Sequence, residues 1–139
     1  QVDMQSYISE IQIESRTLGD MSLNHIIPTA IRYQNILIKN VKGIKEIFGE
    51  KFKSHANDQL IILEEISDHI KKIINGVDQM VLARKNANKI EDVNKKAMAY
   101  AKMVIPYLNE IRDHCDKLEL TIDDSIWPLA KYRELLFIR

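Results

Sequence analysis

The chain has 139 residues, of which 45% are hydrophobic and 29% are charged, a composition that fits one soluble domain with its own core. Its 20 basic and 20 acidic residues cancel, which argues against a nucleic-acid-binding protein because such proteins carry a basic surface. Four Gly and three Pro are too few for the turns of an all-β protein, and no apolar run reaches the roughly 20 residues of a membrane span.

The first third of the chain reads as a helix interrupted by a proline. Apolar residues share one face of it, first Met4, Ile8, Ile11 and Leu18, and then Ala30, Leu37, Val41, Ile44 and Phe48. Pro28 lacks an N–H and clashes with the preceding turn, so we expect a kink there, and Gly49 is a typical helix stop. Unbroken, this helix would run about 70 Å, longer than the helices that follow, so we expect it to be kinked and to overhang them. Its N-terminal apolar residues would then need cover, for example from a second copy of the chain.

The middle third carries a stripe with alternating spacings of four and three, which predicts a second helix beginning between residues 54 and 58 and ending near Ala87. Its members are Leu63, Ile66, Ile70, Ile73, Val77 and Met80.

The last third carries the most regular stripe, a heptad seam typical of a helix that lies along another helix. Its members are Ala97, Ala101, Val104, Leu108, Ile111, Cys115, Leu118 and Ile122. Asn88, with Glu91 three residues later, fits an N-cap, and Pro106 lies opposite the seam. The turn before this helix is very short, so we expect it to run antiparallel to the second helix. The fold class that follows is all-α: an antiparallel bundle of three long helices, the first kinked at Pro28 (four helices is the alternative count), plus a short C-terminal helix.

Four side chains are the only candidates for a metal site, and they are weak ones. Glu65 with His69, and Glu110 with His114, each share a helix face, as ligands in a di-metal bundle do. If the hairpin folds about residue 89, Glu65 lies level with His114 and His69 lies level with Glu110. The usual spacing is Glu-x-x-His, one residue shorter, so paired polar residues at the edge of the helical hairpin are the better interpretation. We therefore assign no metal ligand and no bound cofactor.

Other reactive patterns are weaker still. His69 and Lys72 form the His-x-x-Lys of phosphotransfer bundles, but the core residue Ile73 follows, so a solvated histidine is the better interpretation. The glycines of residues 43–49 lie in a helix and lack the Gly-Lys-Ser/Thr of a phosphate loop. Cys115 is the single cysteine of the sequence and lies in the seam, where it acts as a small apolar residue. A single cysteine cannot form an internal disulfide, which fits a reducing, cytoplasmic location. We predict no catalytic residue in this chain.

The tail is apolar and aromatic, and it predicts a short helix opened by Pro128. Such a helix either caps the core of this bundle or docks on another subunit or domain. The residues we expect at interfaces are Ile8, Ile11, Leu18, Trp127, Tyr132 and Phe137.

Three stretches carry a family resemblance: residues 123–137 (DDSIWPLAKYRELLF), 25–35 (HIIPTAIRYQN) and 41–49 (VKGIKEIFG). Together they closely resemble the carboxyl end of type III glutamine synthetases, over about residues 13–137. Ala130 departs from the pattern, where a second proline is expected. The resemblance implies a parent enzyme that joins ammonia to glutamate with ATP and Mg²⁺, through a γ-glutamyl phosphate, as a large ring of subunits.

In that family the metal, nucleotide and ammonia sites belong to an upstream catalytic domain, and none of those motifs occurs here. We therefore expect residues 1–139 to be one excised, non-catalytic domain, with residues 1–27 leading in from the catalytic domain. Its partners would be that domain and neighbouring subunits, and the fragment itself is a candidate homo-oligomer. The alternatives are an independent metal-binding or histidine phosphotransfer bundle, or an adaptor that regulates the enzyme.

Overall fold

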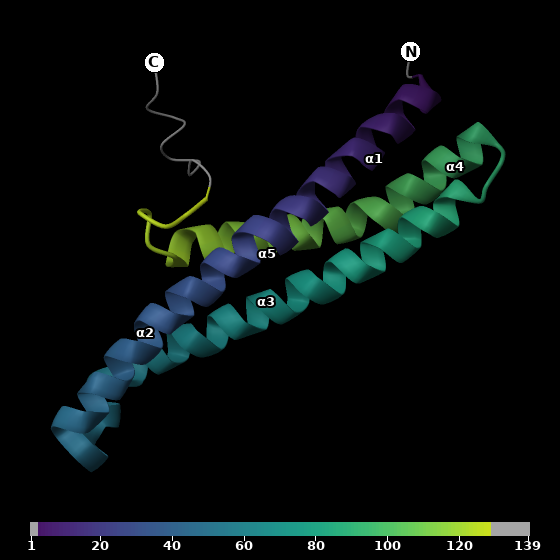
Figure 1. Cartoon of the computed structure of the whole chain (residues 1–139). Helices are drawn as coiled ribbons and strands as arrows, with labels where there is room; N and C mark the ends of the chain where they lie inside the picture. The colour runs from purple at the N-terminus through teal and green to yellow at the C-terminus, as the bar shows by residue number, and fades with distance from the viewer. Residues whose placement is uncertain (1–2, 129–139) are drawn as a thin grey trace.

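The structure is a computed structural model that describes residues 3–128, and no strand occurs among them (Figure 1). Its elements are α1 (Met4–Met21), a π-helical turn (Ser22–Ile26), α2 (Ile27–Phe48), a 3₁₀ turn (Gly49–Lys51), α3 (Phe52–Asn88), α4 (Val93–Ala99), a second π-helical turn (Tyr100–Val104) and α5 (Ile105–Thr121). The all-α class is confirmed. Within the described residues, no helix combines the length and apolar character needed to cross a membrane.

The predicted count of three long helices and a short fourth is not confirmed. Only two of the described helices exceed 20 residues, α2 with 22 and α3 with 37. The predicted third helix is divided into α4, a π-helical turn and α5. The short C-terminal helix was expected on residues that lie outside the described part of the chain.

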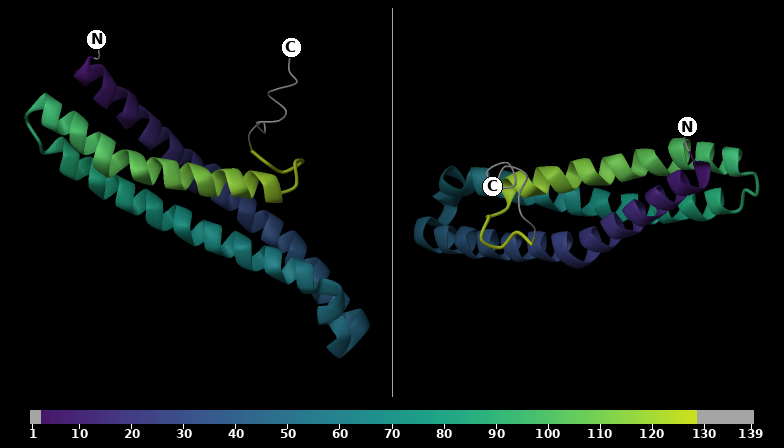
Figure 2. Two further views of the ribbon diagram at one scale, coloured as in Figure 1. Left: turned by 180° about the vertical axis from the view of Figure 1, so that it is seen from behind. Right: turned by 90° about the horizontal axis from the view of Figure 1, so that it is seen from above.

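Both helical prolines follow a π-helical turn, which is why neither one breaks its helix. Pro28 and Pro106 each lie in the first turn of an α-helix, where a missing N–H costs little. In the turn before each proline, the N–H of Ile27 bonds to the carbonyl of Ser22, and the N–H of Ile105 bonds to that of Tyr100, five residues back. The predicted kink at Pro28 is therefore a bend that begins in the preceding turn, and the backbone stays helical through it (Figure 2).

The helices form an elongated bundle. α2 and α3 make an antiparallel hairpin, and α4 and α5 return along α3 (Figure 1). α1 leads into α2 through the first π-helical turn, and it packs against α4 and α5. The end of the α2–α3 hairpin extends past the end of α5, so it consists of two helices only (Figure 2). The overhang is thus the far end of the hairpin and not α1, whose residues Ile8 and Ile11 are buried in this chain's own core.

Local sequence explains where the helices begin and end. Gly49, with φ of 59°, ends α2 in a backbone region that favours glycine, as predicted. The cap of α4 was predicted at Asn88 and is instead Asp92, whose carboxylate accepts the N–H of Lys95 at 2.9 Å. Asn88 is the last residue of α3, and its side chain accepts hydrogen bonds from Gln12 and Tyr100.

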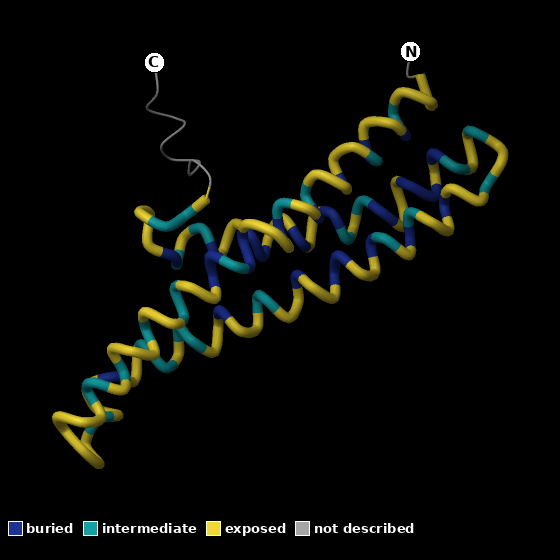
Figure 3. The backbone as a smooth tube through the Cα atoms, in the orientation of Figure 1, coloured by how far each residue is buried: buried dark blue, intermediate teal, exposed yellow. Residues whose placement is uncertain are grey.

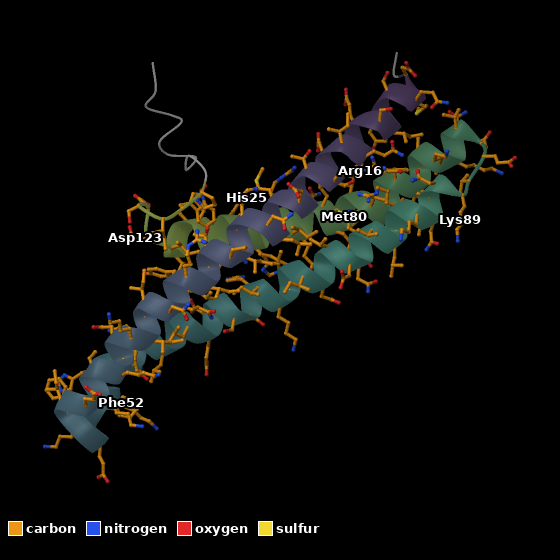
Figure 4. The ribbon with its side chains drawn as sticks, viewed as in Figure 1. Arg16, His25, Phe52, Met80, Lys89 and Asp123 are labelled. Atoms are coloured by element: carbon orange, nitrogen blue, oxygen red, sulfur yellow. The ribbon has the colours of Figure 1, made fainter. Side chains whose placement is uncertain are left out.

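Burial divides the molecule into two regions (Figure 3). We call residues 31–65 the tip, and among them only Ala56 is buried. We call the rest of the described chain the body, and its centre holds large side chains such as Met80, which points between the helices (Figure 4). Most of the heptad seam is buried there, but Ala101 is exposed and Tyr100 is fully buried instead, because the π-helical turn shifts the register by one residue.

Candidate functional site

Two polar clusters lie between the helices of the body. The first is a histidine pair, His69 on α3 and His114 on α5, with Nδ1 atoms 2.9 Å apart and ring centroids 5.1 Å apart. His114 is 8% exposed and His69 is half-buried. The two residues are brought together because α5 runs antiparallel to α3, so that the second histidine lies level with the first. One ring must donate an N–H and the other must accept it, so the pair needs complementary tautomers.

The same short sequence surrounds both histidines. Residues 68–72 and 113–117 both read Asp-His-x-x-Lys, and in each case the aspartate pairs with the lysine four residues on. The distances are 3.1 Å between Lys72 and Asp68 and 3.0 Å between Lys117 and Asp113. The lysine hydrogen bond lowers the pKa of each aspartate. The two aspartates and two lysines around the histidines therefore carry no net charge.

The predicted pairing of each histidine with a glutamate is wrong, because the histidines contact each other and Glu65 and Glu110 are exposed. Among residues 3–128, no group of three or more His, Cys, Asp or Glu side chains is placed to hold a metal ion. The prediction of a solvated His69 is also wrong, since its ring is half-buried and hydrogen-bonded. Lys72 is paired with Asp68, which does not leave it poised beside an imidazole for phosphotransfer.

The second cluster centres on Tyr100, which is 0% exposed and joins three segments of the chain. Its hydroxyl accepts from Nε2 of Gln12 on α1 at 2.9 Å and donates to Oδ1 of Asn88 on α3. Gln12 also donates to Asn88 at 3.1 Å. Beside it, Arg84 of α3 donates to the buried Ser15 of α1 at 3.1 Å, and burial followed by the charge of Arg16 lowers the pKa of Arg84.

This second cluster was not predicted from the sequence. Its members look unremarkable one by one, and the seam pattern placed Ala101 in the core instead of Tyr100. A signal was present, since a π-helical turn was to be expected before the interior Pro106 and would have moved the buried face to Tyr100. The cluster satisfies its own polar groups, so it positions α1 on α3 and offers no reacting group.

Cys115 behaves as predicted from its place in the seam. It is buried, and its Sγ lies 3.5 Å from Oγ of Ser22 on the first π-helical turn. Burial raises the pKa of the thiol, which keeps it protonated and unreactive.

The start of the tail borders an apolar groove. Its volume is about 510 Å³, and its lining includes Ile13, Leu18 and Met21 of α1 and Trp127. The indole Nε1 of Trp127 is buried and has no hydrogen-bond partner among the described residues. Leu18 and Trp127 are half-buried and stay predicted interface residues, while Tyr132 and Phe137 lie outside the described residues.

Comparison with known proteins agrees with the resemblance carried by the sequence. Residues 1–45 match the family model described as glutamine synthetase C-terminal domain. A glutamine synthetase from Bacteroides fragilis is 48% identical over 140 residues, which is 100% of this chain and 19% of that protein. A type-3 glutamine synthetase from Dictyostelium discoideum is 28% identical over 134 residues, 96% of this chain and 18% of that protein. The chain thus spans less than a fifth of the length of these relatives, and over its whole length it is similar to a part of the Bacteroides fragilis glutamine synthetase.

Proposed function

We propose that this chain is the non-catalytic C-terminal helical domain of a type III glutamine synthetase, and that it supports the assembly of the enzyme. The observation that carries the proposal is the match over the whole chain to relatives more than five times as long. The catalytic chemistry, with its ATP and Mg²⁺, would then lie in the remainder of the polypeptide, and the enzyme would work in the cytoplasm. Residues 1–27 would lead into this domain from that remainder.

The chemistry of the described residues supports a structural role. Glutamate–ammonia ligation needs carboxylates that hold metal ions and a cradle for phosphates, and neither the histidine pair nor the Tyr100 cluster supplies them. The same observations disfavour the alternative of an independent metal-binding or phosphotransfer bundle. An adaptor that regulates the enzyme would use the same surfaces as a structural domain, so it is one form of this proposal.

Exposed aliphatic side chains indicate where the remainder of an assembly would pack. Among residues 3–128, three are exposed by more than 60%: Ile13 on α1, Ile47 at the tip and Leu120 at the end of α5, with values of 65%, 77% and 79%. Single exposed apolar residues are common on monomers. Three such residues on separate parts of a long bundle fit docking at several points along it.

The proposal is tested on the full-length polypeptide by deleting residues 54–139 and measuring oligomer size by analytical ultracentrifugation, together with the melting temperature. We expect smaller assemblies or a lower melting temperature. Because a deletion also exposes the core, a finer test replaces Ile47 or Leu120 by lysine, since neither side chain is needed for the core of this chain. These variants should weaken the assembly while the melting temperature of the 139-residue chain stays unchanged. An unaltered assembly and unaltered melting after the deletion would remove the proposal.

A further inference from the structure

The contact between His69 and His114 has a property that neither a family match nor an assembly role requires. Two Nδ1 atoms 2.9 Å apart share one hydrogen, so one ring donates and the other accepts. This arrangement exists when both rings are neutral, and it also exists when one of them carries an extra proton, because the charged ring can donate. A second extra proton leaves a hydrogen on both nitrogens, and the contact then has two donors and no acceptor.

We infer that the His69–His114 contact is a pH-sensitive clasp between α3 and α5, closed while the pair holds at most one extra proton and opened by the second.

The charges around the pair oppose the doubly protonated state. The aspartate and lysine of each Asp-His-x-x-Lys segment neutralise each other, so no carboxylate is left over to balance an imidazolium. Two unit charges a few Å apart repel each other, and they do so more strongly near a protein surface than in bulk water. A divalent metal between the rings would meet the same unbalanced charge, which is why we infer a proton switch and not a metal site.

The carboxylate that favours a charged His69 is Asp68, and it is already paired with Lys72. On α1, Glu14 lies 3.8 Å from Arg112 of α5, so its charge is directed to that guanidinium. On α2, Gln34 donates to Ser67 of α3. The charged residue nearest to Gln34 in the sequence is Arg32, which donates to Thr29 at 3.0 Å. On the two histidine helices, Glu65 and Glu110 are exposed to solvent, where their charges are screened.

The direction of titration agrees with the geometry. Burial, and then the charges of His114 and Lys117, lower the pKa of His69 below its ordinary value of 6.5. The unfolded chain therefore binds this proton more readily than the folded chain does. The stability that depends on neutral His69 is complete above about pH 6.5, and it is lost as the pH falls from there through the lower folded-state pKa. Opening would separate the stretch of α5 around His114 from α3 before the whole chain unfolds.

The test is a series of thermal melts of the 139-residue chain between about pH 7.5 and about pH 5, the range in which histidines titrate. The variants are His69→Gln and His114→Gln, which cannot take up a proton, and the control is His25→Gln at an exposed position of the first π-helical turn. We expect the fall in melting temperature across this range to be at least halved in the first two variants and unchanged in the control. An equal fall in all three variants would overturn the inference.

Two measurements on the unaltered chain keep the inference testable if a variant folds poorly. NMR titration of the imidazole rings should show the pKa of His69 below its ordinary value of 6.5, and backbone amides of α5 near His114 should exchange faster once both rings carry an extra proton. A pKa of His69 at or above 6.5 would contradict the clasp. The melts should also be the same with and without EDTA, and a pH response that disappears with EDTA would show that protons displace a bound metal instead.

Discussion

The body and the tip are built from the same kind of helix, yet they hold together in different ways. In the body, large aliphatic side chains from α3 and α5, such as Ile66, Ile73 and Ile111, are 0% exposed. In the tip, which shares α3 with the body, only Ala56 is buried and isoleucines are left in solvent. A helix pair buries one stripe of each helix at most, and the third helix is what closes the body. Whether an apolar stripe is buried in this molecule depends more on how many helices surround it than on the residues of the stripe.

Contacts in the tip are correspondingly polar and aromatic. Asn40 of α2 donates to Gln59 of α3 at 2.8 Å, and the rings of Phe48 and His55 stack with centroids 4.0 Å apart. Where the tip meets the body, Gln34 donates to Ser67 at 2.8 Å. Exposed hydrogen bonds contribute little net stability, about 1 kcal/mol each, so the tip should open locally more readily than the body.

The largest predicted difference comes from truncating one isoleucine in each region of α3. Ile73→Ala should lower the free energy of unfolding by about 2–5 kcal/mol, because the side chain is fully buried and leaves a cavity. The matched change Ile61→Ala, in the tip, removes a side chain that is 46% exposed and should cost less than about 1 kcal/mol. Urea denaturation of both variants measures the two values. Equal losses would mean that the tip is as well packed as the body.

A smaller effect is expected from the tyrosine hydroxyls. Tyr100→Phe removes the two hydrogen bonds that the hydroxyl makes with Gln12 and Asn88, while the bond between those two amides remains, so we expect a loss of about 1–2 kcal/mol. Tyr33→Phe is the control, since Tyr33 lies in the tip and is half-buried, with no hydroxyl hydrogen bond found in the described part of the chain. Chemical denaturation distinguishes them, and a loss for Tyr33→Phe as large as that for Tyr100→Phe would contradict the role given to the cluster.

The sequence was sufficient for the all-α class and for most of the core of the body. Six of the seam residues from Val104 to Ile122 are buried as predicted, because a stripe with spacings of three and four can face only one way. It was not sufficient for the register around Tyr100, since a π-helical turn inserts one residue into a pattern that otherwise looks continuous. Nor did it distinguish body from tip, because the stripe from Leu37 to Phe48 looks like a core stripe although α5 ends before reaching it.

Only part of the histidine pair could be predicted from the sequence. Placing His69 and His114 on facing helices followed from the antiparallel hairpin, but pairing each with a glutamate required a turn at the wrong residue. The turn runs between Asn88 and Val93 and is longer than predicted, which changes which residues lie level. Each glutamate lies four residues before its histidine, and moving the turn by two residues shifts the facing positions by four, so contacts across a hairpin depend on the exact turn.

The smallest predicted effects are the most informative, because the same substitution should have opposite signs in the two regions. A Cβ added to Gly76 of α3 would lie 2.9 Å from Cγ1 of Ile111, near the middle of that side chain, whereas a Cβ at Gly43 of α2 would meet nothing within 4 Å. Alanine gains about 1 kcal/mol over glycine inside a helix, and overpacking costs about 1–3 kcal/mol. Gly43→Ala should therefore raise the free energy of unfolding by about 0.5–1 kcal/mol, and Gly76→Ala should lower it by about 1 kcal/mol. Denaturant titration of both variants measures the two changes in the free energy of unfolding. A more stable Gly76→Ala variant would show that the side chain of Ile111 can move aside, and that α3 and α5 are packed less tightly than the 2.9 Å distance indicates.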